Sequence, residues 1–212
     1  MREINNQAIQ ALRERVTADM SPKRARHTLA VEQMAARLAE LYCPEKEHVL
    51  RVAALLHDVT KEWSTEQHVA FLQANGASVT PMDTAAPKTL HARTAALLIP
   101  AQFAEYADPE IISAVRYHTT GREGMTLCEQ IVYLADYIDD SRTFPDCVKL
   151  RSMFWDASPA DMSDEQRRAH LARVLIASFD MTVAGLIEDS APISADTFCA
   201  RNSLILQSRV EN

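Results

Sequence analysis

Glycine is scarce in this chain, with only four residues in 212. Average usage is about 7%, so the shortage argues against turn-rich β architectures and favours helices built from the abundant Ala, Leu, Glu and Arg. The sequence also lacks sustained period-two alternation, the pattern of a half-buried strand. These absences predict an all-α protein in one domain over residues 1–212, with a core at about 21–190.

Paired cysteines, long apolar runs and excess positive charge are missing as well. Cys43, Cys128, Cys147 and Cys199 form no Cys-x-x-Cys pair, which argues against a zinc ribbon or a dense disulfide framework and fits reduced thiols. No run approaches the ~18 apolar residues of a membrane span, and the N-terminus has no apolar signal core. A net charge of −7 argues against a general nucleic-acid surface. We therefore expect a cytoplasmic protein with neither membrane nor nucleic acid as a partner.

Apolar residues recur at helical spacing along the chain, between recognisable start and stop signals. Ser64 with Gln67, and Thr126 with Glu129, read as capping boxes, and residues 77–89, with two prolines, read as a loop. Helices are expected from Ile4 to Val16, from Ser21-Pro22 to about Tyr42, from Pro44 to near Asp58, between Ser64 and Gly76, after Thr89, after Asp108, after Thr126, over roughly 164–189 and over roughly 195–207.

Six ionisable residues lie on the apolar faces of these predicted helices. Such a group costs free energy in a core unless it has a partner. A single histidine there is usually a hydrogen-bonded core residue, but six groups would each need a separate buried partner. Imidazole and carboxylate together suit iron, manganese, zinc or cobalt. The sequence therefore predicts a site for one or two metal ions, with these ligands: His27, His57, Asp58, His91, His118 and Asp136.

The adjacent pair His57-Asp58 is the distinctive element of this series. Both side chains can approach a metal from one helix end, and a carboxylate can bridge two ions through its two oxygens. In two-metal sites about 3.5–4 Å apart, a bridging hydroxide attacks phosphorus in line with the leaving oxygen. The pair therefore favours a phosphohydrolase.

Cationic residues follow the predicted ligands closely in sequence. Arginine matches phosphate with its planar fork, and lysine acts as a point charge, so the site is expected to take a polyphosphate. For Arg116 and Arg122 the alternative is an ordinary solvated charge. The remaining histidines, His48, His68 and His170, are expected at the surface. The cations in question are Arg24, Lys61, Arg116, Arg122 and Arg142.

The series Arg24-x-x-His27, His57-Asp58-x-x-Lys61, His91, His118 and Asp136 resembles that of the HD-domain phosphohydrolases. The stretch Ala114–Arg122, read as Ala-Val-Arg-Tyr-His-Thr-Thr-Gly-Arg, resembles more closely the YqeK family, the HD-type symmetrical bis(5'-nucleosyl)-tetraphosphatases. The segments Glu129–Ile138 and Asp196–Asn202 are similar to that family too. After Ile138 the chain reads Asp-Asp-Ser-Arg, where a Glu-Pro-x-Arg-like sequence is expected.

This resemblance implies an all-α HD bundle with a central dinuclear metal site and cleavage of diadenosine tetraphosphate into two ADP. His27, His57, Asp58 and Asp136 would hold one metal, often iron, and His91 and His118 the second, with Asp58 as the bridge. Arg24 and Lys61 would join Asp58 in catalysis. Candidates for phosphate contacts are Arg24, Lys61, Arg116, Thr119, Arg122 and Arg142.

Two other functions stay open on the sequence alone. A second hydrolase hypothesis keeps the metals and takes a nucleoside monophosphate or a cyclic nucleotide as substrate, because superfamily members share ligands and differ in pocket walls. A third hypothesis is a nucleotide sensor without turnover, whose signature would be a missing ligand. Metal identity and a homodimer built through the helix at 164–189 are left undecided.

Overall fold

The computed structural model describes residues 5–210, which contain eleven α-helices, four short 3-10 turns and no strand. The predicted all-α class is confirmed. Ile4, part of the first expected helix, lies outside the described residues. The α-helices are α1 (Asn6–Ala18), α2 (Pro22–Tyr42), α3 (Glu47–Leu56), α4 (Thr65–Ala74), α5 (Pro81–Ala85), α6 (Leu90–Gln102), α7 (Pro109–Tyr117), α8 (Leu127–Ile138), α9 (Pro145–Trp155), α10 (Asp164–Glu188) and α11 (Ala195–Val210).

The helix starts are fixed by the side chains that the sequence marks. Ser21 accepts a hydrogen bond from the Arg24 amide at 3.2 Å at the start of α2. Both predicted capping boxes, Ser64 with Gln67 and Thr126 with Glu129, are present. Each box satisfies backbone amides that lack an intrahelical partner. The boxes therefore fix the first residues of α4 and α8.

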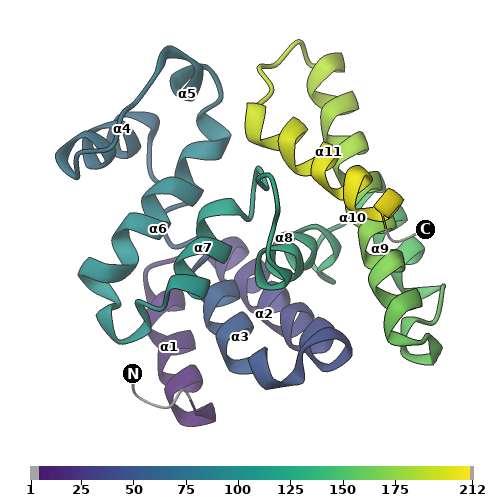
Figure 1. Cartoon of the computed structure of the whole chain (residues 1–212). Coiled ribbons are helices and arrows are strands. Elements are labelled where there is room, and N and C mark those ends of the chain that lie inside the picture. The colour runs from purple at the N-terminus through teal and green to yellow at the C-terminus, as the bar shows by residue number, and fades with distance from the viewer. Residues whose placement is uncertain (1–4, 211–212) are drawn as a thin grey trace.

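The centre of the bundle consists of α2, α3, α7 and α8, which pack against one another. Figure 1 shows α4 and α5 on one side of this centre and α9–α11 on the other. Fully buried side chains such as Leu38, Leu55 and Ile131 fill the core. The predicted metal ligands project from these central helices and from α6, which packs on α7.

Gly121 ties the end of α7 to the C-terminal helices. Its φ of +63° lies in the left-handed region, and a Cβ there would come within 2.7 Å of Phe179 and 2.8 Å of Ala200. Only glycine fits both the conformation and the space. The turn that follows His118 is therefore also a packing point for α10 and α11.

Several expectations from the sequence need correction. His68 and His170 are buried, not at the surface, and the Nε2 atom of His170 lies 3.0 Å from the carbonyl oxygen of Phe154; His48 is half-buried. The expected loop at 77–89 contains α5, and the whole of α9 was not predicted.

The helix α10 is the one helix of the described chain that is long and apolar enough to cross a membrane, and 33% of its most apolar window is buried. Arg173 and Asp180 interrupt its apolar run, which is why the sequence shows no uninterrupted span. In this fold α10 packs against α9 and α11.

Candidate metal centre

The six predicted ligands come from five helices or their ends and meet at the centre of the bundle. His27 lies in α2, and His91 and Asp136 lie in α6 and α8. His57 and His118 follow the last residues of α3 and α7. Each of the six is at most 9% exposed. The structure therefore brings together all the residues that the sequence singled out as ligands.

The end of α3 presents two ligands in succession. After Leu56 the chain leaves the helix in a series of turns, in which the Lys61 amide donates to the Asp58 carbonyl at 3.0 Å. Thr60 is fully buried in the same turns and donates from its hydroxyl to the His91 carbonyl at 2.9 Å. This bond fixes the His57-Asp58 pair relative to the start of α6.

Asp58 lies between two pairs of histidines. Its Oδ2 atom is 3.3 Å from His57 Nε2 and 3.7 Å from His27 Nε2. Its Oδ1 atom is 3.2 Å from His91 Nε2 and 3.8 Å from His118 Nε2. One oxygen thus faces each pair, which is the arrangement that a bridging carboxylate requires.

Backbone carbonyls orient two of the imidazole rings. The Nδ1 atom of His57 lies 2.6 Å from the Ala54 carbonyl oxygen, and that of His118 lies 2.7 Å from the Val115 carbonyl oxygen. A ring that donates from Nδ1 keeps the Nε2 lone pair for a metal. In both residues Nε2 points into the cluster.

Unpaired atoms in the cluster test whether the residues fit a metal. Within residues 5–210, the buried atoms His27 Nε2, His57 Nε2 and Asp58 Oδ1 make no hydrogen bond of acceptable geometry, although His27 Nε2 lies 2.9 Å from Asp136 Oδ1. Buried polar atoms are normally satisfied, and a metal ion held among these three side chains would satisfy all three atoms. Two groups have ligand atoms within 4.8 Å of one another: His27, His57 and Asp136, and His57, Asp58 and His118. The donor set suits a borderline transition metal.

Most of the cluster is held in the protonation states that bind metal. Burial lowers the pKa of His91 and His118 and so keeps their imidazoles neutral. For Asp58 burial acts in the opposite direction, but the neighbouring His57 and further partners hold the carboxyl pKa well below its usual range. Neutral imidazole and ionised carboxylate are the ligand forms.

His27 is the exception among the ligands. Burial lowers its pKa, but the adjacent carboxylates of Asp136 and Asp139 outweigh burial and raise the pKa to about 9. Without a metal, the carboxylates on this side favour a proton on His27. A metal ion would take the place of that proton.

Four of the six predicted phosphate-binding residues contact the cluster. Arg24 pairs with the Asp58 carboxylate, and Arg142 Nη2 lies 2.6 Å from Asp136 Oδ1. Lys61 Nζ lies 3.1 Å from His91 Nε2. The Thr119 hydroxyl is 3.1 Å from His118 Nε2 and 3.2 Å from His91 Nε2. These four side chains surround the predicted ligands with donors.

Arg116 and Arg122 lie elsewhere in the described structure, with no contact to the six ligands. Both guanidinium groups stack on the Tyr117 ring, at 4.9 Å and 5.3 Å from its centroid. Arg122 also donates from Nε to the buried Glu129 carboxylate at 2.9 Å. Their predicted role in phosphate binding has no support from these contacts.

Asp139 is a residue of the site that the sequence analysis did not single out. It is fully buried, its Oδ2 atom lies 3.3 Å from His27 Nδ1, and its Oδ1 atom accepts from the Ser141 amide at 2.8 Å. A carboxylate behind a ligating histidine fixes the ring and raises its basicity. The signal in the sequence was the acidic residue just after Ile138, where the chain departs from the family pattern.

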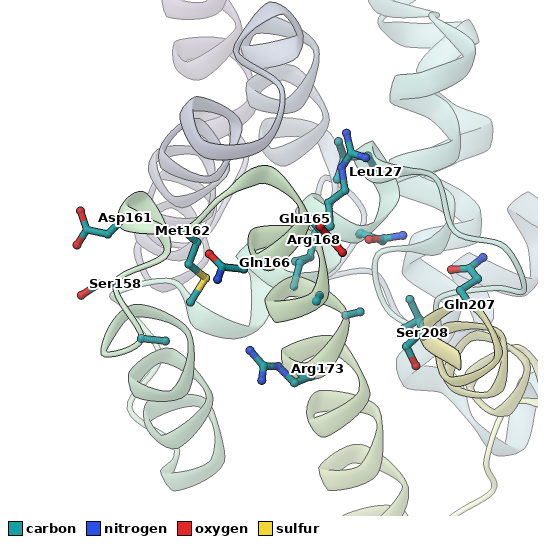
Figure 2. A pocket seen from close by; sticks show the side chains of 16 residues that line it. Leu127, Ser158, Asp161, Met162, Glu165, Gln166, Arg168, Arg173, Gln207 and Ser208 are labelled. Atoms are coloured by element: carbon teal, nitrogen blue, oxygen red, sulfur yellow. The ribbon is translucent and has the colours of Figure 1, made fainter. Parts of the chain in front are cut away.

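A cavity of about 1120 Å³ lies away from the cluster, between the start of α8, the first half of α10 and the end of α11. Figure 2 shows acidic and basic side chains together along it, among them Glu165, Arg168 and Arg173. None of the predicted ligands or phosphate-binding residues lines this cavity, so it is separate from the candidate metal centre.

Comparison with known proteins identifies the class. The HD domain family model matches residues 24–140, a range that contains all six predicted ligands. A crystal structure from Clostridium acetobutylicum, described as a predicted HD superfamily hydrolase involved in NAD metabolism, has a TM-score of 0.79 at 29% identity. The match covers 93% of this chain and 97% of that one. The fold and the site thus define an HD-domain hydrolase.

Two curated relatives indicate a particular group within the HD-domain family. A Bacillus subtilis protein is 30% identical over 90% of this chain and 94% of its own length, and a Halalkalibacterium halodurans protein is 29% identical over 92% and 95%. Both are named symmetrical bis(5'-nucleosyl)-tetraphosphatase. The chain therefore belongs to the HD-domain family and, within it, to the group of the symmetrical bis(5'-nucleosyl)-tetraphosphatases.

Proposed function

We propose that this chain hydrolyses dinucleoside tetraphosphates symmetrically and splits diadenosine tetraphosphate into two ADP. The observation that carries the proposal is the position of Asp58, with one oxygen facing each histidine pair. Arg24 and Lys61 lie at the same carboxylate. A polyphosphate bound over Asp58 would meet two metal positions and two cations at once. The names of the relatives agree with this substrate.

The proposal includes two metal ions. His27, His57, Asp58 and Asp136 would hold one, and His91 and His118 would hold the other, with Asp58 shared. When bound, such ions supply an acidified water as the nucleophile and neutralise charge on the phosphate oxygens. Iron is our first choice for the metal, and manganese, cobalt and zinc fit the same donor set.

The cations of the site hold the phosphate chain in this proposal. Arg24 and Arg142 are already aligned by their bonds to Asp58 and Asp136, so little side-chain ordering is needed when phosphate arrives. Their planar forks match pairs of phosphate oxygens, and Lys61 adds a point charge. The oxygen of water bonds to one of the two central phosphorus atoms, and the bond from that phosphorus to the oxygen shared with the other central phosphorus breaks. The attacked half leaves as one ADP, the other half leaves with the shared oxygen as the second ADP, and the protons of the water pass to the products and to solvent.

Product analysis tests the proposal. Freshly purified protein of known metal content is incubated with diadenosine tetraphosphate, and the products are separated by ion-exchange chromatography. ADP as the sole product is the expected result. AMP with ATP would overturn the symmetric cleavage, and the absence of product from metal-loaded protein would overturn the assignment of this substrate.

A further inference from the structure

A cavity of about 220 Å³ opens beside the cluster. It lies between the turns after α3, the start of α4 and the start of α6, and α4 packs against α6. The predicted ligand His91 lines this cavity, and so does Lys61, which contacts His91. A molecule in the cavity would therefore be adjacent to any group bound at the predicted ligands. The lining residues are Lys61, Trp63, Thr65, His68, Pro87, Lys88 and His91.

Trp63 provides the aromatic wall of this cavity. Its indole is half-buried and meets the Phe71 ring edge to face, with centroids 5.4 Å apart. The His68 ring lies 5.8 Å away. These two rings support the indole from the α4 side, so its orientation is set before a ligand arrives. A fixed aromatic face with an open side is the platform on which nucleobases stack.

A buried hydrogen-bond network connects this wall to the predicted ligand His91. The Nδ1 atom of His68 lies 2.9 Å from the Thr94 hydroxyl, which lies 2.8 Å from the Thr60 hydroxyl. Thr60 in turn donates to the His91 carbonyl at 2.9 Å. Buried hydrogen bonds therefore join His68, which packs on Trp63, to the backbone of the predicted ligand His91.

The charge of the lining residues also favours a nucleotide as the ligand. Lys61 and Lys88 contribute two ammonium groups, and no acidic residue is among the lining residues found in the described chain. An aromatic face combined with cations is the chemistry that recognises a nucleotide, through base stacking and phosphate attraction.

We propose that this cavity is a nucleobase subsite, in which one base of the substrate stacks on Trp63 while its phosphates extend past Lys61 to the cluster. The subsite rests on the proposed function for its ligand class. Its test, however, uses the binding of a nucleotide and needs no turnover.

The test compares ADP with pyrophosphate, which has the same phosphate chemistry and no base. Trp63→Leu removes the π face but keeps apolar bulk against Phe71, and Trp63→Phe keeps a face. In calorimetric titrations of the metal-loaded proteins, we expect Trp63→Leu to weaken ADP binding about 5- to 100-fold. Pyrophosphate binding should be unchanged, and Trp63→Phe should retain most of the ADP affinity.

A spectroscopic signal reports the stacking directly. The chain has two tryptophans, and Trp155 lies in α9 against the Arg37 guanidinium, 4.3 Å from the ring centroid. In a Trp155→Phe background, ADP should quench the fluorescence of Trp63, and pyrophosphate should not. A purely structural role of Trp63 would give no base-dependent quenching.

The outcomes separate this proposal from the proposed function. If the wild-type protein binds ADP and quenches but releases no ADP from diadenosine tetraphosphate, the subsite stands and the function fails. If symmetric turnover is seen but Trp63→Leu binds ADP as tightly as wild type, the function stands and the subsite is wrong. The subsite is also wrong if the wild-type protein binds no ADP, or if Trp63→Leu weakens ADP and pyrophosphate equally.

Discussion

The two histidine pairs of the cluster share Asp58 but have opposite surroundings. Behind His27 lies the buried carboxylate of Asp139, and beside it lies Asp136. Around His91 and His118 the neighbours are Lys61, Thr119 and the buried hydroxyl of Thr60. The pKa of His27 is accordingly raised to about 9, whereas burial lowers the pKa of His91 and His118.

This contrast indicates different affinities for a cation. The first half, around His27, has the carboxylates of Asp136 and Asp139 besides the shared Asp58. These three outnumber the neighbouring guanidinium groups of Arg24 and Arg142, so this half should bind an ion tightly, while the ion competes with a proton for His27. The second half, around His91 and His118, offers neutral ligands whose Nε2 atoms are 2.9 Å apart, and its only carboxylate among the predicted ligands is the shared Asp58. We therefore expect the second ion to be the more weakly held.

The shared carboxylate gives the largest expected effect. Asp58→Ala removes an oxygen from each half, so metal content should fall in both halves. The rate of hydrolysis should fall on the order of 10³-fold or more. Metal analysis and kinetics on the same sample test this. Full activity in the metal-depleted variant would contradict both the shared role of Asp58 in the two halves and the proposed function.

Removing one histidine from each half should separate the two sites. His118→Ala is expected to lose one equivalent of metal and keep the first half occupied. His27→Ala should retain less metal overall, because the carboxylate-rich half supplies the tighter site. Metal titrations of both variants, with circular dichroism to confirm helix content, measure this difference. Equal losses in the two variants would show that the halves are not distinct.

The ligands could be predicted from the sequence because each is an anomaly there. A histidine or aspartate on an apolar helix face needs a buried partner, and one metal site would provide that partner for all six residues. Asp139 and Trp63 could not be found in this way, because an acidic residue after a helix and a single tryptophan in a connecting segment are ordinary in a sequence. Their contacts exist only after distant segments have packed.

The wrong predictions for His68, His170 and α9 have physical causes as well. His68 and His170 lie near polar residues in sequence, but Trp63 and Phe154 pack on their rings. The helix α9 was missed because apolar residues also occupy its outer side, where Phe144 before it and Val148 within it are exposed. Apolar residues on both sides leave no clear helical period.

A smaller effect is expected from the carboxylate behind His27. Asp139→Asn keeps the shape of the side chain but removes its charge, so the first ion should bind roughly 10- to 100-fold more weakly. Binding at the second half should change little. Asp140→Asn is the matched control, because this neighbour is exposed and pairs with Arg37 at the surface. Metal titration of the two variants decides the point, and equal affinities would remove Asp139 from the site.

The smallest effect concerns the neutral network behind His91. Burial lowers the pKa of His68 to about 4, against about 6.5 for an unperturbed histidine. Below about pH 6.5 the unfolded chain takes up a proton that the folded chain excludes, so this part of the stability is complete above that pH and is lost as pH falls toward 4.

Comparing wild type with His68→Gln isolates this contribution, because glutamine retains a hydrogen-bonding group beside Thr94 but does not titrate. Between about pH 7.5 and pH 5 the wild-type protein should lose roughly 1 kcal/mol more stability than the variant, since solvent screening reduces the full linkage. Urea unfolding at both pH values measures the difference. Equal losses of stability in the wild-type protein and the variant would mean that His68 accepts a proton in the folded chain. The surroundings of His91 and His118 would then not be neutral, and the contrast between the two halves would be weaker.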